Sequence, residues 1–505
     1  TDTAVYGISW AVELLIAEAI LLVNGSVLAL ATATIILGLV TLFACVGLLA
    51  LHPRRPIPLR SSESLPLLYA LLGFGLRWGY FNNWTGLLTL GAALTGVGVG
   101  RRREAWKPLT YLSLAGISVA WYELVLYQML QGTGGSAADA FTILAGVATA
   151  IAFAYRLLAW FWQSRTEEPF LSLSVAEIKT TAHIHWFIGS FLMVIAGAIA
   201  INGDTLPRLA GIAITLCLLL ATYTLMQGRR NASYNAANIW VYIGCFELVA
   251  TVVFARLVWS ELSVLDAWFP LIACGVACVT YELPWQRWGW IKTPWKRSAV
   301  LLPIFTVCAT TEVISDLSLL LVAGFYAWIA QRSSNIRFTY ISVVLVDWAI
   351  GRWLERLQLT DDPLWYASLF GLSLLYIAQF DPGLKQREQR DSRHYLRILG
   401  SGIICGVALL FHQDTGLIPA IIGAIAIFAG LILRVRAFLF VGTATFLLTV
   451  FYQLVILIFE YPFIKWVVGL IAGIIFIAMA ANFETRREQI ASVLRSSRNE
   501  LDTWE

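Results

Sequence analysis

Five polar side chains recur at one kind of position in a chain that is otherwise rich in apolar residues. Each lies in the middle or outer half of an apolar run, as Glu123 does in "WYELVLYQ" (121–128). An ionised carboxylate there would cost on the order of 2.5–3.5 kcal/mol, so a carboxyl without a partner favours its protonated form. A neutral acid donates one hydrogen bond and accepts others, as an amide does. We call this set the polar row, and its members are Glu13, Glu123, Glu247, Asp347 and Gln453.

Two kinds of chemistry suit the polar row. The first is structural, because polar groups between membrane helices hydrogen-bond across the interface for roughly 1 kcal/mol each. The second is transport, in which protonatable groups serve the path of an ion or solute. Gln453 cannot carry a proton, which weakens the second interpretation for the last member of the row.

Other charges within the apolar runs need partners or access to water. Arg256 lies nine residues after Glu247. Side chains on one helix contact each other when they are three or four residues apart, so an ion pair of either residue needs a partner on another helix. Arg352 likewise follows Asp347 on the same run. Snorkelling of long side chains towards the membrane surface explains most of the charges near the ends of runs. Those charges are Glu18, Arg77, Glu312 and Lys465.

Residue types that commonly form catalytic or metal sites are few. The chain has five His and seven Cys, and the cysteines all fall within apolar segments without the loop spacing of metal ligands. In "HIHW" (183–186) two His at i and i+2 project to different faces of a helix, which favours a structural role over a metal or tetrapyrrole site. Phosphate-binding, nucleophile-elbow and zinc-protease motifs are missing from the sequence. We therefore predict no catalytic residue, no metal site and no enzymatic activity.

The elements that position these residues are predicted to be membrane helices. Of 505 residues, 59% are hydrophobic and 13% are charged, and the mean hydropathy is +0.75. The charged share is roughly half that of a soluble domain, and apolar runs of about 20 residues can each cross the bilayer. The fold class predicted is all-α, a polytopic integral membrane protein with about 18 transmembrane helices. The predicted spans are 4–23, 27–51, 64–80, 84–100, 108–131, 137–162, 184–201, 208–227, 237–259, 264–283, 298–314, 317–331, 337–357, 364–380, 396–412, 416–433, 437–459 and 461–481.

The order of turns and helices indicates a tandem repeat of four helices. Basic turns begin at residues 100, 228, 331 and 434, and each is followed by an aromatic-rich helix, an acidic or neutral turn, and a further helix. An even number of helices makes the repeats run parallel, unlike the inverted repeats of many transporters. We predict a half repeat at 1–51, repeat 1 at 52–162, repeat 2 with an amphipathic linker at 163–283, repeat 3 at 284–380, repeat 4 at 381–481, and a cytoplasmic amphipathic tail at 482–505. Because the chain opens in mid-repeat, we expect either that an ancestral array lost its first hairpin or that the natural protein extends further N-terminally, and the missing Met favours the second.

Charge asymmetry predicts the orientation. Lys and Arg gather in the basic turns, in the linkers between repeats and in the tail, whereas the opposite turns contain acids and no Lys or Arg. The positive-inside rule then places the first group, and both termini, in the cytoplasm. The segments 167–182 and 485–505 read as amphipathic helices on that surface.

The closing run "LRVRAFLFVGTATFLLTVFYQLVILIFEYPFIKWVVGL" resembles large uncharacterised multi-pass membrane proteins of cyanobacteria, most strongly over about 431–490. The resemblance implies a bacterial plasma or thylakoid membrane and assigns no activity to any residue.

Three functions fit these observations. A non-enzymatic membrane scaffold or complex subunit, holding lipids or other membrane proteins, is favoured by short loops and parallel repeats. A transporter or lipid translocator using the buried acids is the alternative, and pigment or haem binding is the third. Bound lipids are expected, no other cofactor is predicted, and the small net charge of +4 does not indicate nucleic-acid binding.

Overall fold

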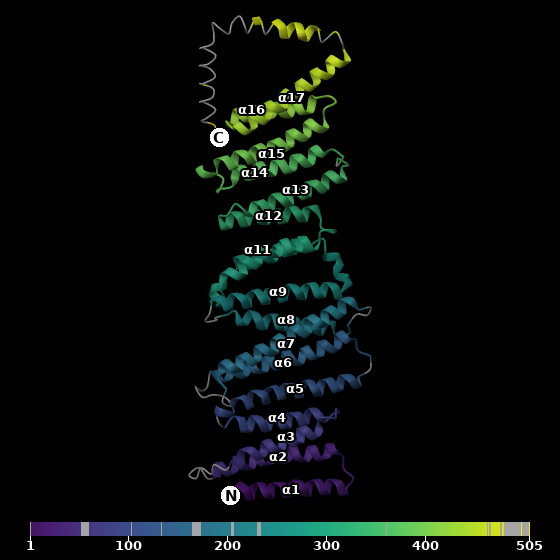
Figure 1. Cartoon of the computed structure of the whole chain (residues 1–505), viewed down its shortest axis with the longest axis vertical. Coiled ribbons are helices and arrows are strands. Elements are labelled where there is room, and N and C mark those ends of the chain that lie inside the picture. Colours follow the sequence, from purple (N-terminus) through teal and green to yellow (C-terminus); the bar gives the residue numbers. More distant parts are fainter. Residues whose placement is uncertain are drawn as a thin grey trace. The chain divides into compact units, whose positions relative to one another are not determined.

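The computed structural model describes residues 2–51, 60–102, 104–132, 134–163, 173–203, 207–229, 234–359, 361–461, 463, 466–474, 477–478, 496 and 504. The elements formed there are seventeen α-helices and four short 3₁₀ helices (Figure 1). The predicted all-helical architecture is confirmed for this part of the chain.

The chain divides into two compact units. The first comprises Thr1–Ser263 with Pro284–Pro294, and the second comprises Val264–Leu283 with Trp295–Glu505. Helices of the first unit are α1 (Asp2–Leu22), α2 (Val27–Leu51), α3 (Ser61–Arg77), α4 (Thr85–Gly100), η1 (Glu104–Trp106), α5 (Lys107–Gln131), α6 (Ala137–Gln163), α7 (Val175–Asn202), α8 (Ala210–Gln227), α9 (Tyr234–Val258) and η3 (Trp285–Trp288).

The second unit contains most of the remaining helices, and two elements, η2 (Ser260–Leu265) and α11 (Lys292–Ala309), cross a division between the units. The others are α10 (Phe269–Glu282), α12 (Asp316–Ser333), α13 (Phe338–Arg356), α14 (Pro363–Phe380), η4 (Arg387–Gln389), α15 (Arg390–Phe411), α16 (Leu417–Leu433) and α17 (Arg436–Glu460).

Ten helices of the described chain are long and apolar enough to cross a membrane: α1, α2, α5, α6, α7, α8, α9, α14, α15 and α17. The first seventeen predicted spans each overlap an α-helix, including shorter or more polar ones such as α10 (14 residues) and α13. Of the eighteenth, residues 466–474 and 477–478 are helical. The predicted amphipathic segment 167–182 is described from 173 onwards, where Val175 begins α7 and the helix continues into the span. The predicted tail helix lies outside the described residues except for 496 and 504.

Helices joined by basic connections pack most closely. The most extensive contacts in the two units join α2 to α3, α4 to α5, α6 to α7, α8 to α9, α12 to α13, α14 to α15, and α16 to α17. Helices joined by the acidic or neutral turns, such as α5 and α6 or α13 and α14, share far smaller contacts. Each tight hairpin therefore has its connection on the basic side.

Small residues produce this close packing. In α6, Ala145, Ala148, Ala152 and Ala159 are fully buried, at helical spacing along one face. In the α16–α17 hairpin a Cβ atom on Gly442 would lie 2.7 Å from the carbonyl oxygen of Gly423. Membrane helices gain stability from such backbone approach, since lipid supplies little hydrophobic drive between them.

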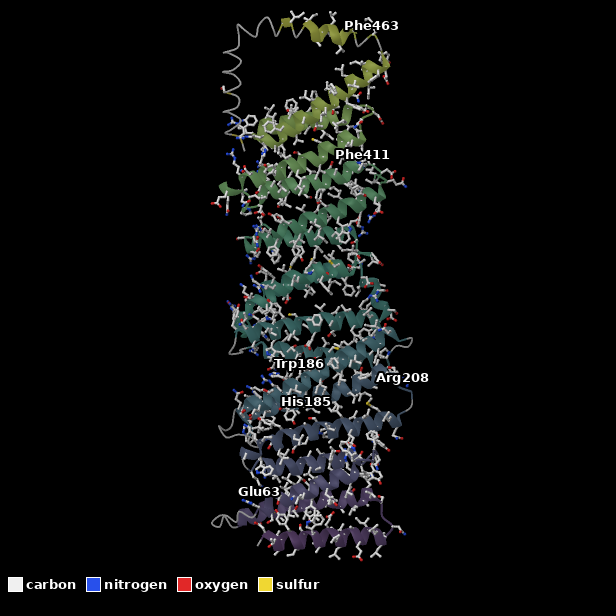
Figure 2. All side chains as sticks on the ribbon, viewed as in Figure 1. Glu63, His185, Trp186, Arg208, Phe411 and Phe463 are labelled. Atoms are coloured by element: carbon white, nitrogen blue, oxygen red, sulfur yellow. The ribbon has the colours of Figure 1, made fainter. Side chains whose placement is uncertain are left out.

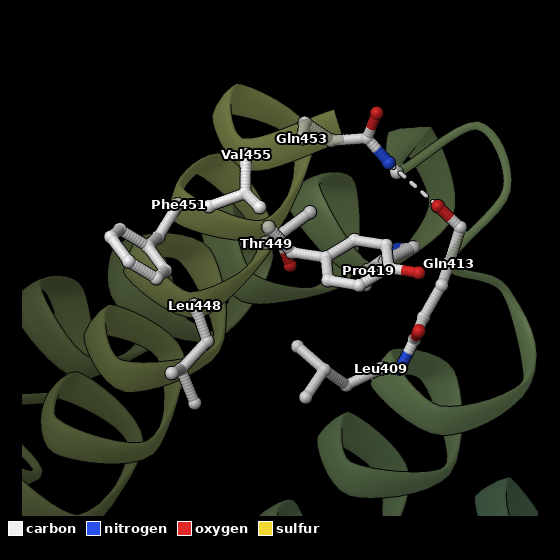
Figure 3. A pocket seen from close by; sticks show the side chains of 10 residues that line it. Leu409, Gln413, Pro419, Leu448, Thr449, Phe451, Gln453 and Val455 are labelled. Carbon is white, nitrogen blue, oxygen red and sulfur yellow. Dashed lines mark hydrogen bonds between the residues drawn. The ribbon is translucent and has the colours of Figure 1, made fainter. Parts of the chain in front are cut away.

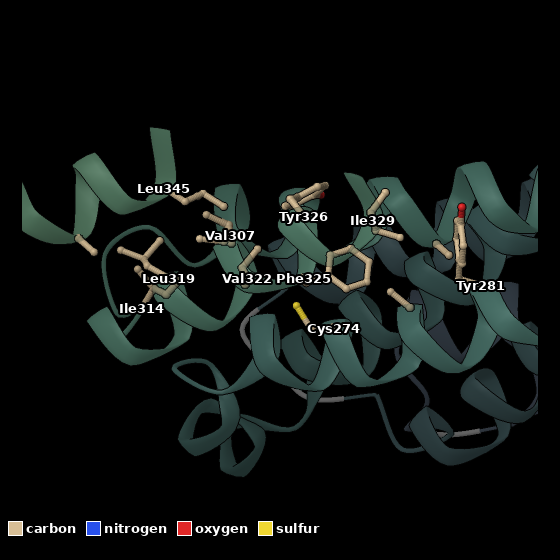
Figure 4. Close-up of a cluster of buried hydrophobic side chains, with 14 residues drawn as sticks. Cys274, Tyr281, Val307, Ile314, Leu319, Val322, Phe325, Tyr326, Ile329 and Leu345 are labelled. Carbon is tan, nitrogen blue, oxygen red and sulfur yellow. The ribbon is translucent and has the colours of Figure 1, made fainter. Parts of the chain in front are cut away.

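The most continuous apolar core lies in the second unit, where α10, α11, α12 and α13 meet (Figure 4). Tyr326 of α12 is fully buried there, and its hydroxyl donates to the carbonyl oxygen of Val300 at 2.7 Å. A second core joins α6, α7 and α8 in the first unit.

Candidate functional site

The five members of the polar row lie on α1, α5, α9, α13 and α17, the helices that the predicted repeat would make equivalent. Each of them hydrogen-bonds to a neighbouring helix or turn. Among the described residues, no hydrogen bond or ion pair joins one member of the row to another. The row is therefore a set of separate sites.

Glu123 is an ion-paired member of the row. Its Oε1 atom lies 2.5 Å from Nη1 of Arg77 on α3, and Thr89 of α4 donates to its Oε2 atom at 2.8 Å. The side chains of Arg77 and Glu123 are only 10% and 11% exposed. Three helices thus meet at one buried ion pair, and Arg77 contacts Glu123 rather than snorkelling to the surface as its position near a helix end predicted.

Glu247 accepts hydrogen bonds from two helices. Ser190 of α7 donates to Oε1 at 2.9 Å, and Thr224 of α8 donates to Oε2 at 2.8 Å. Both bonds come from neutral hydroxyls. Glu247 therefore links α9 to two helices that precede it, and no ion pair to Glu247 is found among the described residues.

Asp347 of α13 accepts a hydrogen bond from Ser373 of α14. Arg352 lies about one turn further along α13. Its Nε atom lies 3.3 Å from Oδ1 of Asp316, and its Nη1 atom donates to the carbonyl oxygen of Ile314. The arginine therefore forms its ion pair with α12, as its need for another helix predicted, and Asp347 is bonded to a hydroxyl.

Glu13 is the most buried member of the row, with 6% of its surface exposed. Its Oε1 atom lies 2.6 Å from the hydroxyl of Thr34 on α2, and its Oε2 atom has no hydrogen-bond partner among the described residues. Glu13 also lines a cavity of about 130 Å³ between α1 and α3.

Gln453 is held by a turn rather than a helix. Its Nε2 atom donates to the carbonyl oxygen of Gln413 at 2.6 Å, between α15 and α16 (Figure 3). Gln453 lines a second cavity, of about 260 Å³.

The threonine hydroxyls that meet the three glutamates are each shared with a helix carbonyl. Thr34 lies within hydrogen-bond distance of both Glu13 and the carbonyl oxygen of Leu30, at 2.9 Å. Thr224 is shared in the same way between Glu247 and the carbonyl oxygen of Ala221, at 2.7 Å, and Thr89 between Glu123 and the carbonyl oxygen of Thr85, at 3.0 Å. Glu123 differs from the other two in its additional contact with a guanidinium.

The two histidines of "HIHW" face different helices, as their spacing predicts. His185 is labelled in Figure 2 beside Trp186. Both of its ring nitrogens form hydrogen bonds, one with the carbonyl oxygen of Thr181 and one with the hydroxyl of Ser118, each at 2.9 Å. His183 contacts the Tyr223 hydroxyl at 2.9 Å and lies 4.9 Å from the Trp240 ring. These contacts use the histidines as packing groups at the basic end of the first unit.

Two buried aspartates that join separate segments, Asp139 and Asp381, were not predicted from the sequence. Asp139, only 4% exposed, accepts the backbone N–H of Leu209 at 2.8 Å and so ties α6 to the start of α8. Asp381, after α14, accepts the Tyr340 hydroxyl at 2.5 Å and lies 3.6 Å from Arg337, and the Tyr340 bond is the main cause that lowers the pKa of its carboxyl. Asp139 lies three residues after Ser136, and Asp381 directly precedes a Pro, and both patterns indicate the end of a helix. Their partners Leu209 and Tyr340 are remote in sequence, so neither contact could be predicted.

No group of three or more His, Cys, Asp or Glu in the described chain has the arrangement of a metal site, and the cysteines described there form no disulfide. Comparisons with protein-family models, curated proteins and solved structures found no match to this chain.

Proposed function

We propose that the chain is a non-enzymatic multi-pass membrane scaffold or a subunit of a membrane complex. The observation that carries this proposal is the bonding of the polar row. Each of its five side chains is hydrogen-bonded to a neighbouring helix or turn, which is the behaviour of groups that hold helices together. The process that the complex serves is left open by this bonding.

The proposed architecture has about 18 spans in parallel four-helix repeats. Support comes from the repeated packing, since the tight hairpins of both units have their connections on the basic side. By the positive-inside rule this side, with both termini, is cytoplasmic, and the membrane is a bacterial plasma or thylakoid membrane. The partners proposed are the lipid bilayer, bound lipids and other membrane proteins, with no nucleic acid, catalytic residue, metal or further cofactor.

The lateral surface is suited to such partners. Large apolar side chains such as Leu22, Phe246, Ile432 and Phe459 are more than 70% exposed on the outside of the helices. In a bilayer these side chains contact lipid or the helices of another protein.

Native mass spectrometry of the protein extracted mildly from its own membrane, together with an absorbance spectrum, tests the proposal. We expect stoichiometric companion subunits and no chromophore. A bare chain that keeps no companion through a gentle extraction, while remaining folded, would contradict a scaffold. A coloured preparation would instead favour pigment or haem binding.

A transporter or lipid translocator is the second candidate. It is favoured by Glu13, whose Oε2 atom is buried, unpartnered in the described chain and beside a cavity. Solute or lipid flux in proteoliposomes that is lost in Glu13→Gln and Glu247→Gln, and kept in Glu18→Gln, would support it. Glu18 is the matched control because it is an exposed carboxyl on the same helix as Glu13. Equal flux in all variants would remove this candidate.

A further inference from the structure

The cavity beside Gln453 has apolar walls and a polar end. Leu409 of α15, Pro419 of α16, and Leu448 and Phe451 of α17 form the walls (Figure 3). The lining residues include no Asp, Glu, Lys, Arg or His. A charged or strongly hydrated ligand would lose its hydration there without a compensating charge.

The polar end is fixed by the turn at 412–416. Gly416 has a φ of +61°, and a Cβ atom there would lie 2.6 Å from the Gln453 side chain, so the turn and the amide approach as closely as glycine permits. The bond from Nε2 to the Gln413 carbonyl uses one of the two amide hydrogens of Gln453. The second hydrogen and the Oε1 atom form no hydrogen bond within the described chain. One donor and one acceptor are therefore held in a defined place.

The exposure of the cavity walls and the size of the cavity indicate what can occupy it. Phe451 and Leu448 are 66% and 54% exposed, so the walls continue onto the outer face of α17, one of the ten candidate spans. An α-helix has a diameter of about 10–12 Å and is too wide to enter, and the cavity lies below the ~300–1,000 Å³ of a drug-sized site. A single hydrocarbon chain suits both the size and the walls.

We propose that this cavity binds one acyl chain of a membrane lipid, with the ester region of the lipid hydrogen-bonded to Gln453. Leu448 precedes Gln453 by five residues, about 7–8 Å along the helix, so the methylene groups lie beside Leu448 while the ester lies beside the 412–416 turn. This assignment holds whether or not the chain is a scaffold, because it rests on the cavity alone.

Photo-crosslinking of the full chain in liposomes tests the proposal. The probe is a phosphatidylglycerol with a diazirine on one acyl chain, and adducts are mapped by peptide mass spectrometry. We expect adducts on Leu409, Leu448 and Phe451 to exceed severalfold those on Ile432 and Phe440. These two controls are lipid-exposed side chains, 78% and 51% exposed, that do not line the cavity.

Matched variants separate the cavity from general lipid contact. Leu448→Trp fills the cavity and should reduce its adducts severalfold, whereas Leu447→Trp, at a neighbouring side chain that is 60% exposed and does not line it, should leave them unchanged. Gln453→Leu should spread the adducts over more residues of the protein, because the ester loses the hydrogen bonds that hold the lipid in one position.

Two results would overturn the proposal. One is labelling of the unaltered protein that is no higher in the cavity than at Ile432 and Phe440. The other is a cavity closed to lipid by the chain itself, shown by disulfide formation between a cysteine at Leu448 and one introduced within 466–474. Neither result depends on whether the tryptophan variants fold.

Discussion

At the residue scale, the acids of the polar row differ in the partner that each one meets. Glu13, Glu123 and Glu247 each meet a threonine hydroxyl that is also bonded to a helix carbonyl, but only Glu123 among them also meets a guanidinium in the described chain, that of Arg77. The same residue type, at positions that the predicted repeat makes equivalent, therefore has two kinds of partner.

Breaking the ion pair should destabilise the first unit. Arg77→Gln leaves a buried carboxylate and Glu123→Gln leaves a buried guanidinium, and each is expected to cost about 3–5 kcal/mol in the free energy of unfolding. The double variant should cost less than the sum, because neither charge remains. Reversible unfolding in mixed micelles measures the cycle, and additive costs would show that the two groups are not coupled.

At the scale of elements, backbone approach between small residues closes the hairpins. Gly442→Leu should lower the apparent Tm by several degrees, because a Cβ atom at Gly442 would lie 2.7 Å from two backbone atoms of α16. Gly324→Leu on α12 is the matched control, since no atom lies within 4 Å of a Cβ atom there. Thermal unfolding in one detergent compares them, and equal shifts would contradict close packing as the cause.

The connection after α14 should give the second unit an acid-sensitive element. Bonds to Tyr340 and the Gly383 N–H lower the pKa of Asp381, so its contribution to stability is complete above the ordinary carboxyl pKa of about 4. That contribution is lost as pH falls through the lowered value. Apparent Tm should therefore fall on acidification below about pH 4, and Asp381→Asn should be less stable at pH 7 and lose less on acidification. An unchanged pH profile in the variant would argue against this role.

At the scale of the whole molecule, the proposed parallel repeats would place all basic connections on one side of the membrane. A cysteine at Ser334, in an exposed basic turn, should react with a membrane-impermeant maleimide only after the cytoplasmic face is opened. A cysteine at Ser260, exposed in a turn of the opposite class, should react in intact cells or spheroplasts. The same accessibility at both positions would exclude the proposed topology.

The sequence alone determined the membrane character, the helical class and the approximate position of each helix. The length and hydropathy of an apolar run are properties of that segment alone, so they can be read from the sequence without knowledge of the neighbouring helices. The same holds for the polar row, because a carboxyl in an apolar run stands out by type. Helix ends were less certain, as α11 shows: it ends at Ala309, whereas the predicted span reached 314.

Only the tertiary structure decided what each polar side chain meets. Arg77 is 46 residues from Glu123, and Ser190 is 57 residues from Glu247, so spacing along the chain carries no signal of either contact. The cavities likewise depend on how separate segments leave space between them, α1 and α3 at Glu13, and α15, α16 and α17 at Gln453. Hydropathy determines that a helix lies in lipid, but the choice between an ion pair, a hydroxyl and a cavity belongs to the packing of its neighbours.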